Sequence, residues 1–382
     1  MTIQLKNPTL ANRASFYGDN TFIIGLFGAN CSSGRAVTLV PERWTGDWQD
    51  CKKLAQMSDA AGIDFMLPIG RWKGYGGVTD YQGATYETIN WASGLLACTK
   101  RITVFGTVHA PLFNPVMGAK MMVTADHIGE GRFGLNIVCG WNEGEFEMFG
   151  VKQKDHANRY KQAQEWCEVV KRAWSNDEVE FDYDGEFHHH KGVRAKPKPY
   201  REARPVIMNA GSSPEGQAFA IRNCDAYFTQ ASRETVEATQ GRVSTIKNAA
   251  LALGRDLEVY TVGVVTCRRT MKEAQDYYHY AAVENADWSA VDDIMAIKGL
   301  TPQSMGQEAF ELRRTQYANG MGGVPIIGDP DYVAEQFEKL HRSGLRGIAL
   351  SMVNYLDELP FFQAEVLPRL QRKGLRAPVA MQ

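Results

Sequence analysis

The sequence predicts a closed (β/α)8 barrel, an α/β fold in which parallel strands alternate with helices. Three observations lead to this fold class. Eight short apolar runs alternate with longer amphipathic segments, which is the order of successive βα units. The 382 residues lie within the range of roughly 200 to more than 400 that such barrels span. No repeat, low-complexity tract or Pro/Gly-rich linker divides the chain. An open doubly wound sheet is the second candidate, and sandwich or all-helical folds do not fit the alternation.

In the first half of the chain, each predicted strand precedes a segment with the apolar spacing of a helix. The predicted strands are residues 22–28, 64–68, 102–107 and 133–138. The predicted helices are residues 48–61, 86–98, 115–128 and 158–174. The third of these helices opens with Pro115, and proline is favoured in the first turn of a helix.

The second half continues the same alternation. Its predicted strands are residues 206–209, 226–229, 258–266 and 347–352. Its predicted helices are residues 214–223, 233–253, 271–285, 332–343 and 359–372. We therefore expect residues 1–382 to form one barrel domain that carries insertions.

Two segments exceed what a minimal barrel needs. Residues 178–192 alternate polar and apolar side chains around Asp184-Gly185, which predicts a β-hairpin. Residues 288–327 form a long mixed segment that ends in a glycine-rich sequence. Segments of this length inside a compact protein are usually lids or binding loops, so we expect a lid, with a plain surface insertion as the alternative.

Composition excludes several classes of protein. The net charge is 42 − 44 = −2, and 44% of residues are apolar, as in an ordinary globular protein. Without a basic excess, we expect no binding to nucleic acid or membrane surfaces. Seven dispersed cysteines without a CxxC pair, and a polar N-terminal segment, predict a cytoplasmic protein with reduced thiols.

Candidate site residues follow the predicted strands, because barrel enzymes place their active sites at the C-terminal ends of the strands. Several polar and aromatic side chains occupy such positions. These candidates are Gly70, Arg71 and Trp72 after the second strand, Thr107, His109 and Phe113 at the third, and Asn136 and Trp141 at the fourth.

A predicted phosphate site follows the fifth strand. Gly211, Ser212 and Ser213 precede a helix that opens with Pro214. Free backbone N–H groups and hydroxyls at a helix N-terminus can bind phosphate. The alternative is a serine that only caps the helix, and this pattern alone does not separate the two.

Two further side chains have open roles. Asn136 lies inside an apolar run, where a buried amide needs hydrogen-bond partners, so it serves either the fold or a ligand. His109 is either an acid/base or part of a polar pocket wall.

His188, His189 and His190 lack the accompanying spacing of a metal site, so we expect no metal. Neither a GxGxxG fingerprint nor a GxxxxGK[ST] loop is present.

Residues 124–141 (TADHIGEGRFGLNIVCGW) and 155–160 (DHANRY) resemble the bacterial-luciferase-like, FMN-dependent monooxygenases. Further similar motifs follow in family order, from about residue 20 to residue 372. They are residues 196–199 (KPKP), 209–213 (NAGSS), 327–330 (IGDP) and 365–368 (EVLP). Within the family, residues 71–77 are similar to the pyrimidine monooxygenases, whereas residues 140–146 are similar to the dimethyl sulfone and alkanesulfonate monooxygenases. The substrate class therefore stays open between pyrimidine or amide-like, organosulfur and aromatic compounds.

This resemblance implies a luciferase-like barrel that uses FMN as FMNH2, delivered by a separate NAD(P)H:flavin reductase. It also implies a homo-oligomer. Matched position by position, it implies a set of FMN-binding residues in which Arg159, Tyr160, Ser212 and Ser213 hold the phosphate. The set consists of Gly70, Arg71, Asn136, Glu145, Arg159, Tyr160, Gly211, Ser212 and Ser213.

The resemblance further implies that O2 is activated as a flavin peroxide on C4a or N5 of the ring. Thr107 and Asn136 match the positions that hold the oxygen, with His109 beside them. Trp72, Phe113 and Trp141 then form the wall of the substrate pocket. An F420-dependent oxidoreductase and a non-catalytic flavin-binding protein are the alternative functions.

Overall fold

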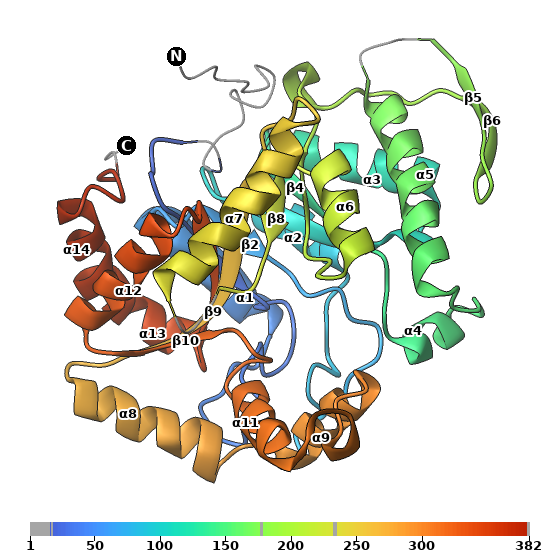
Figure 1. Ribbon diagram of the computed structural model, residues 1–382. Coiled ribbons are helices and arrows are strands. Elements are labelled where there is room, and N and C mark those ends of the chain that lie inside the picture. Colours follow the sequence, from blue (N-terminus) through green and yellow to red (C-terminus); the bar gives the residue numbers. More distant parts are fainter. Residues whose placement is uncertain (1–15, 17, 176–178, 232–234, 380–382) are drawn as a thin grey trace.

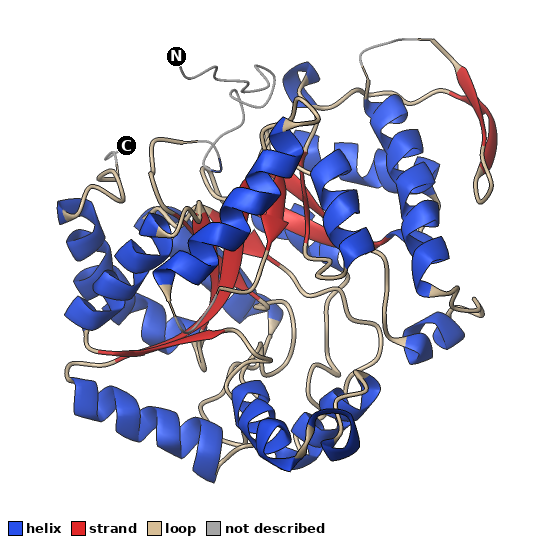
Figure 2. Ribbon diagram, in the orientation of Figure 1, coloured by secondary structure: helices blue, strands red, loops and turns tan. Residues whose placement is uncertain are grey.

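The computed structural model describes residues 16, 18–175, 179–231 and 235–379. It contains a closed barrel of eight parallel strands surrounded by helices (Figures 1 and 2). The predicted fold class is confirmed. In spatial order the barrel strands are β1 (Ile23–Phe27), β2 (Phe65–Leu67), β3 (Thr103–His109), β4 (Phe133–Val138), β7 (Val206–Asn209), β8 (Ala226–Phe228), β9 (Glu258–Cys267) and β11 (Gly347–Ser351). Pairing of β11 with β1 closes the ring.

Helices cover the outside of the barrel and one of its ends. They are α1 (Trp48–Ala61), α2 (Thr88–Ala97), α3 (Pro115–Ile128), α4 (Glu143–Met148), α5 (His156–Trp174), α6 (Pro214–Asn223), α7 (Val236–Leu251), α8 (Met271–His279), α9 (Trp288–Ile297), α10 (Pro302–Met305), α11 (Gln307–Ala318), α12 (Pro330–Arg342), α13 (Tyr355–Phe361) and α14 (Leu367–Arg372). None of the described helices is long and apolar enough to cross a membrane.

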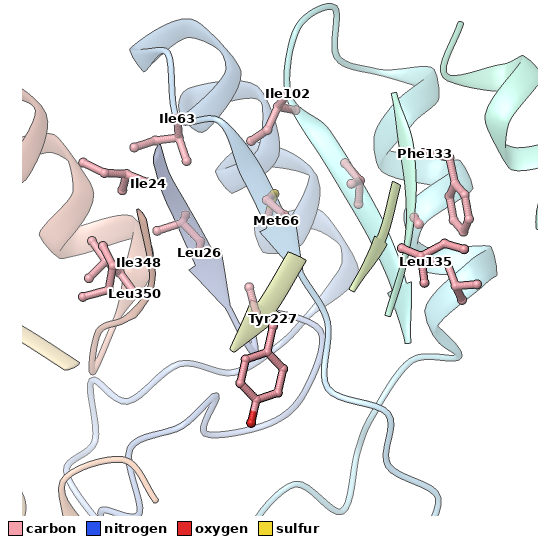
Figure 3. Packing of buried hydrophobic residues seen from close by; sticks show 14 of the residues in the cluster. Ile24, Leu26, Ile63, Met66, Ile102, Phe133, Leu135, Tyr227, Ile348 and Leu350 are labelled. Atoms are coloured by element: carbon pink, nitrogen blue, oxygen red, sulfur yellow. The ribbon is translucent and has the colours of Figure 1, made fainter. Parts of the chain in front are cut away.

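The strands are apolar throughout because both of their faces are buried. Successive side chains point to opposite faces, so Ile24 and Leu26 of β1 pack outward under the helices, whereas Ile23 points into the barrel. Figure 3 shows side chains of this layer, which come from β1, β2, β4, β8 and β11 and from the residues that precede β2 and β3. This packing fixes the register of the strands and the positions of the residues that follow them.

Phe16 closes the barrel at the N-terminal ends of its strands. Its ring centroid lies 5.4 Å from that of Tyr260, 5.7 Å from that of Phe65 and 5.6 Å from that of Phe105. Phe16 is 2% exposed. This contact was not predicted, because Phe16 lies in a polar segment of the sequence.

The long insertion contains more regular structure than the sequence predicted. Residues 288–327 hold α9, α10 and α11, and β10 (Val324–Gly328) begins within them. β10 pairs in parallel with the last five residues of β9, whose first residues pair with β8. Figure 1 shows α9 and α11 together, apart from α6, α7 and α12.

Smaller differences lie at element ends. A π-helical turn, Tyr280–Glu284, follows α8 where the sequence predicted helix to residue 285, and the closing helical segment begins at Tyr355 instead of residue 359. The antiparallel pair β5 (Phe181–Asp184) and β6 (His189–Val193) lies in the predicted hairpin and projects beyond α5 (Figure 1). Residue 178 of that hairpin and residues 233–234 of the predicted helix 233–253 lie outside the described residues.

Candidate active site

A cavity of about 660 Å³ opens at the C-terminal ends of the barrel strands. Most of the predicted site residues line it. These residues are Gly70, Arg71, Thr107, His109, Asn136, Trp141, Arg159, Tyr160, Gly211, Ser212 and Ser213. Segments far apart in the sequence meet there because the C-terminal ends of parallel strands share one end of the barrel.

Three predicted residues lie outside the cavity lining. Trp72 and Phe113 pack near each other, with ring centroids 6.4 Å apart, and Trp72 also contacts Phe149. Glu145 lies behind Arg71. A role of Trp72 and Phe113 in the substrate wall stays a prediction.

Thr107 and Asn136 form the polar floor of the cavity. They are register partners on β3 and β4. The Asn136 Nδ2 donates to Thr107 Oγ1 over 3.2 Å, and the Thr107 hydroxyl donates to the Pro68 carbonyl over 2.7 Å. The buried Asn136 Oδ1 meets no hydrogen-bond donor among the described residues. Asn136 is therefore the member of the pair with an acceptor left for a ligand.

Gly70 allows the chain after β2 to lie against this floor. A Cβ at this position would lie 2.9 Å from both His109 Cε1 and Thr107 Cγ2. The preceding residue is fixed by Asn30, whose side chain donates to the Ile69 carbonyl over 2.9 Å and accepts from the Ile69 N–H over 2.7 Å. Asn30 was not predicted as a site residue, although it lies only three residues after the end of β1.

Glu145 organises one wall of the site from α4. It is 1% exposed, and its Oε1 accepts from Arg71 Nη1 over 2.8 Å and from the Trp72 N–H over 2.9 Å. The Arg71 guanidinium also lies over the rings of Tyr75 and Trp141, at 4.5 and 5.4 Å from their centroids. Glu145 thus compensates the charge of Arg71 and holds it against the aromatic wall.

His109 is buried beside the same carboxylate, with its Nε2 3.6 Å from Glu145 Oε2. Burial lowers the pKa of His109 to about 4, against the opposing effect of Glu145 and with a further lowering by Arg71. The ring is therefore neutral near pH 7. In that state it acts as a hydrogen-bonding group of the pocket wall and does not supply a cationic acid.

This lowered pKa makes the stability of the protein depend on pH. The unfolded chain binds a proton at His109 below about pH 6.5, whereas the folded chain binds it only below about pH 4. Stability is therefore lost as the pH falls through this window, by up to about 3 kcal/mol. We expect His109→Gln to lose about 2 kcal/mol less than wild type between pH 7 and pH 4.5, measured by urea unfolding. His279→Gln, at an exposed site, is the control, and an equal change in both variants would contradict the assignment.

The opposite end of the cavity is suited to an anion. The N-termini of α5 and α6 meet there, with His156 Nδ1 3.4 Å from Glu215 Oε2. Arg159 donates through Nη1 to the Lys154 carbonyl over 2.9 Å, while its buried Nε meets no acceptor in the described part of the chain. Burial raises the pKa of Tyr160 to about 12, so its hydroxyl keeps its proton and can donate. The two helix ends and these donors favour phosphate.

Ser213 shows that the two roles predicted for the serine pair, phosphate binding and helix capping, are compatible. Its Oγ accepts from the Gly216 N–H over 3.1 Å, so Ser213 is the N-cap of α6. An N-cap hydroxyl still has its own proton to donate. Tyr160 and Gly216 also leave no room for a side chain at Gly211, which brings the backbone close to this end of the cavity.

Two further features of the sequence are Cys139, which lines the cavity, and the three histidines at residues 188–190. Burial raises the pKa of Cys139 to about 12, which suits a packed thiol and not a nucleophile. The rings of His188 and His190 stack at 5.8 Å on the hairpin. Across the described ranges, no group of three or more His, Cys, Asp or Glu side chains could hold a metal ion.

The cavity is also lined by residues that were not predicted from the sequence. Arg35 enters it from the segment after β1, and Ile297, Lys298 and Met321 enter it from the insertion. Arg35 lies seven residues after Gly28, where the predicted first strand ends, so it could have been found among the residues that follow that strand. Lys298 carried no sequence signal, because only the packing of α9 brings it to the barrel.

A parallel barrel with a polar floor and an anion-binding end at the C-terminal ends of its strands defines an α/β-barrel enzyme that binds a phosphorylated cofactor. The family model described as "Luciferase-like monooxygenase" matches residues 26–347. The chain belongs to this family, which confirms the resemblance and the predicted class of enzyme.

Individual relatives match over nearly the whole chain. The FMNH2-dependent dimethylsulfone monooxygenase of Pseudomonas putida is 29% identical over 361 residues, which cover 92% of this chain and 96% of the relative. The pyrimidine monooxygenase RutA of Acinetobacter baylyi is 26% identical over 353 residues, covering 90% and 94%. The solved structure of the long-chain alkane monooxygenase LadA has a TM-score of 0.84 and 19% identity, and covers 95% and 94%, which supports the fold.

Proposed function

We propose that the protein is an FMNH2-dependent monooxygenase that transfers one oxygen atom from O2 to a small organic substrate. A separate NAD(P)H:flavin reductase supplies the reduced FMN. The observation that carries the proposal is the joining, in one cavity, of a floor with an unpartnered acceptor at Asn136 and an anion-binding end around Arg159. The relatives named for FMNH2-dependent oxygenation support the same function.

The residues of the cavity fit FMN. Arg159, Tyr160, Ser212 and Ser213 offer a charged donor and three hydroxyls for the phosphate. At the other end, Asn136 can both donate and accept, as the edge of a flavin ring requires. Gly70, Arg71 and Gly211 border the space between, and Glu145 acts through Arg71. Reduced FMN, when bound, supplies the electrons that activate O2.

The protein then has two tasks, which are to orient the reactants and to exclude water. Thr107 and Pro68 fix the orientation of Asn136, because each hydrogen bond in this chain determines the next. His109, neutral near pH 7, supplies no proton that would discharge the activated oxygen. Trp141, with Trp72 and Phe113 beyond it, is proposed to border the substrate.

The insertion is proposed to act as the lid. Val291, Ile294 and Met295 of α9 are fully buried in a cluster with Tyr75 and Tyr81, so the structure shows the insertion packed onto the barrel. Gly320 and Gly322 have φ values of 111° and 80°, which L side chains rarely adopt. Opening about these glycines is expected to admit substrate.

The free cysteines fit a reducing compartment such as the cytoplasm, and a homo-oligomer is also proposed.

Rapid mixing tests this function. Protein loaded with anaerobically reduced FMN is mixed with oxygenated buffer, and flavin absorbance and hydrogen peroxide are followed. We expect reoxidation at least about tenfold slower than for free FMNH2, because the closed cavity excludes water. Thr107→Val, which keeps the shape but removes the hydroxyl, is expected to release more hydrogen peroxide per flavin oxidised, because Asn136 loses its acceptor.

Other outcomes identify the alternatives. Binding of F420 with reduction of a substrate and no oxygen consumption would identify an F420-dependent oxidoreductase. Tight FMN binding without oxygen-dependent product for any substrate would identify a non-catalytic flavin protein. Unchanged peroxide release in Thr107→Val would remove the role given to Thr107.

A further inference from the structure

We propose that Arg35 and Lys298 form a second anion site in the cavity, and that the substrate is a small organic anion with a carboxylate or sulfonate group. This inference rests on the proposed function and specifies its substrate. Arg35 comes from the segment after β1, and Lys298 from the end of α9, so the barrel and the insertion each contribute one cation.

The charges around the cavity lead to this inference. Among the described residues, the lining includes the cations Arg35, Arg71, Arg159 and Lys298, and no Asp or Glu. Arg71 is compensated by Glu145 from behind. Arg159 is assigned to the cofactor phosphate. Among the described residues, Arg35 and Lys298 therefore have no carboxylate partner, and neither is assigned to the cofactor phosphate.

Of the two cations, Arg35 gives the stronger support for an anion site. It is 8% exposed, its Nη2 donates to the Gly320 carbonyl over 2.7 Å, and its Nε meets no acceptor among the described residues. Its guanidinium lies over the Phe27 ring, 4.5 Å from the centroid, and no ion pair joins it to a carboxylate of the described residues. Burial lowers its pKa, so the surroundings disfavour the charged form. A buried cation of this kind gains most from an anionic ligand.

Lys298 lines the same cavity from the C-terminal end of α9. Its Nζ lies 5.0 Å from the ring centroid of Trp141 and 5.2 Å from that of Tyr317. Loss of solvation, with the nearby charges of Arg35 and Arg71, lowers its pKa to about 8. The residue is nevertheless exposed, as expected for an ammonium group that opens into a cavity. A lysine at a helix C-terminus can serve the helix dipole alone, but that role does not place it over Trp141.

An adjoining cavity extends the positive region. It measures about 680 Å³, shares Arg35 with the first cavity, and is also lined by Arg242 and Arg313. In the part of the chain that the structure describes, it too has no Asp or Glu in its lining. Such a field raises the local concentration of anions. The aromatic groups Trp141 and Tyr317 beside Lys298 suit the organic part of the ligand.

An anionic substrate would distinguish this chain from the dimethylsulfone monooxygenase to which it is similar. Dimethyl sulfone, after which one relative is named, carries no charge. Methanesulfonate has nearly the same size and shape and carries one negative charge. The two compounds therefore form a matched pair of probes, and benzoate with benzamide forms a second pair that tests the carboxylate.

The test measures binding to protein loaded with oxidised FMN, by calorimetry at pH 7. We expect methanesulfonate or benzoate to bind at least about tenfold more tightly than its neutral partner. Lys298→Met is expected to remove this preference, to leave the affinity for the neutral probes unchanged, and to leave the affinity for FMN unchanged. Lys272→Met is the control, because Lys272 is 81% exposed on α8 and pairs with Asp276. Arg35→Lys provides a second variant that keeps the charge but loses the guanidinium geometry.

Three results would overturn the anion site. They are equal binding of charged and neutral probes, an anion preference that survives Lys298→Met, and a loss of FMN affinity in Lys298→Met that exceeds any loss for the anions. The last result would assign the cations to the flavin. Preference for sulfonate or for carboxylate decides between the two head groups. Because binding is measured without turnover, an anion site can be established even where the oxygenase activity fails.

Discussion

Glu145→Ala is expected to lower the free energy of unfolding by about 3–5 kcal/mol, which is the usual effect of breaking a buried ion pair. The variant leaves the guanidinium of Arg71 buried without a counterion and removes the acceptor of the Trp72 N–H. Urea unfolding at pH 7 measures the change. The affinity for FMN is expected to fall together with the stability, because Arg71 borders the cofactor space.

Glu145→Gln removes the negative charge but keeps an oxygen that can accept the hydrogen bonds, so it separates the two contributions. The amide oxygen can still accept from Arg71 and Trp72, so we expect about half of the loss seen in the alanine variant. Glu147→Ala, at an exposed position on the same helix, is the control. A loss below about 1 kcal/mol in Glu145→Ala would show that solvent reaches Arg71 and that the wall is not organised as described.

Arg159→Met is expected to weaken FMN binding by about 10- to 100-fold. The variant removes one charge-assisted hydrogen bond to the phosphate, worth about 1.5–3 kcal/mol. Riboflavin, which lacks the phosphate, is the matched ligand, and its affinity is expected to stay unchanged. Fluorescence titration of the flavin measures both affinities.

Arg222→Met serves as the control variant, because Arg222 is exposed at the far end of α6. An equal loss of affinity for FMN and riboflavin in Arg159→Met would place Arg159 at the ring instead of the phosphate. The Asn136 end of the cavity would then have to be reassigned as well.

The barrel could be predicted because its signal is local. Each strand is a short apolar run, and several site residues were found because they follow such runs, as Gly70 and Arg71 follow β2 and Ser212 follows β7. Glu145, Arg159 and Tyr160 lie in α4 and α5, and only the family resemblance indicated them. Asn136 and Thr107 were placed side by side from their strands alone, and β3 and β4 pair them. These features depend only on the alternation of strands with helices.

The features that the sequence did not predict depend on contacts between distant segments. β10 is a strand because its residues 324–328 pair with residues 263–267. Lys298 reaches the cavity because α9 packs against Tyr75 and Tyr81, more than 200 positions earlier in the chain. Phe16 lies in a polar stretch and is buried only because the barrel offers it Phe65, Phe105 and Tyr260.

The position of Phe16 has a kinetic consequence. Aromatic rings fill the N-terminal end of the barrel. Cofactor and substrate must therefore enter the cavity from the other end, where the insertion lies. FMN held at Thr107 and Asn136 would lie deeper in the cavity than a substrate held near Lys298 and Met321, which come from the insertion. In that arrangement FMNH2 would have to enter before the substrate, and oxidised FMN would have to leave after the product. Steady-state analysis is expected to show a compulsory order, with excess substrate slowing the exchange of flavin with its reductase.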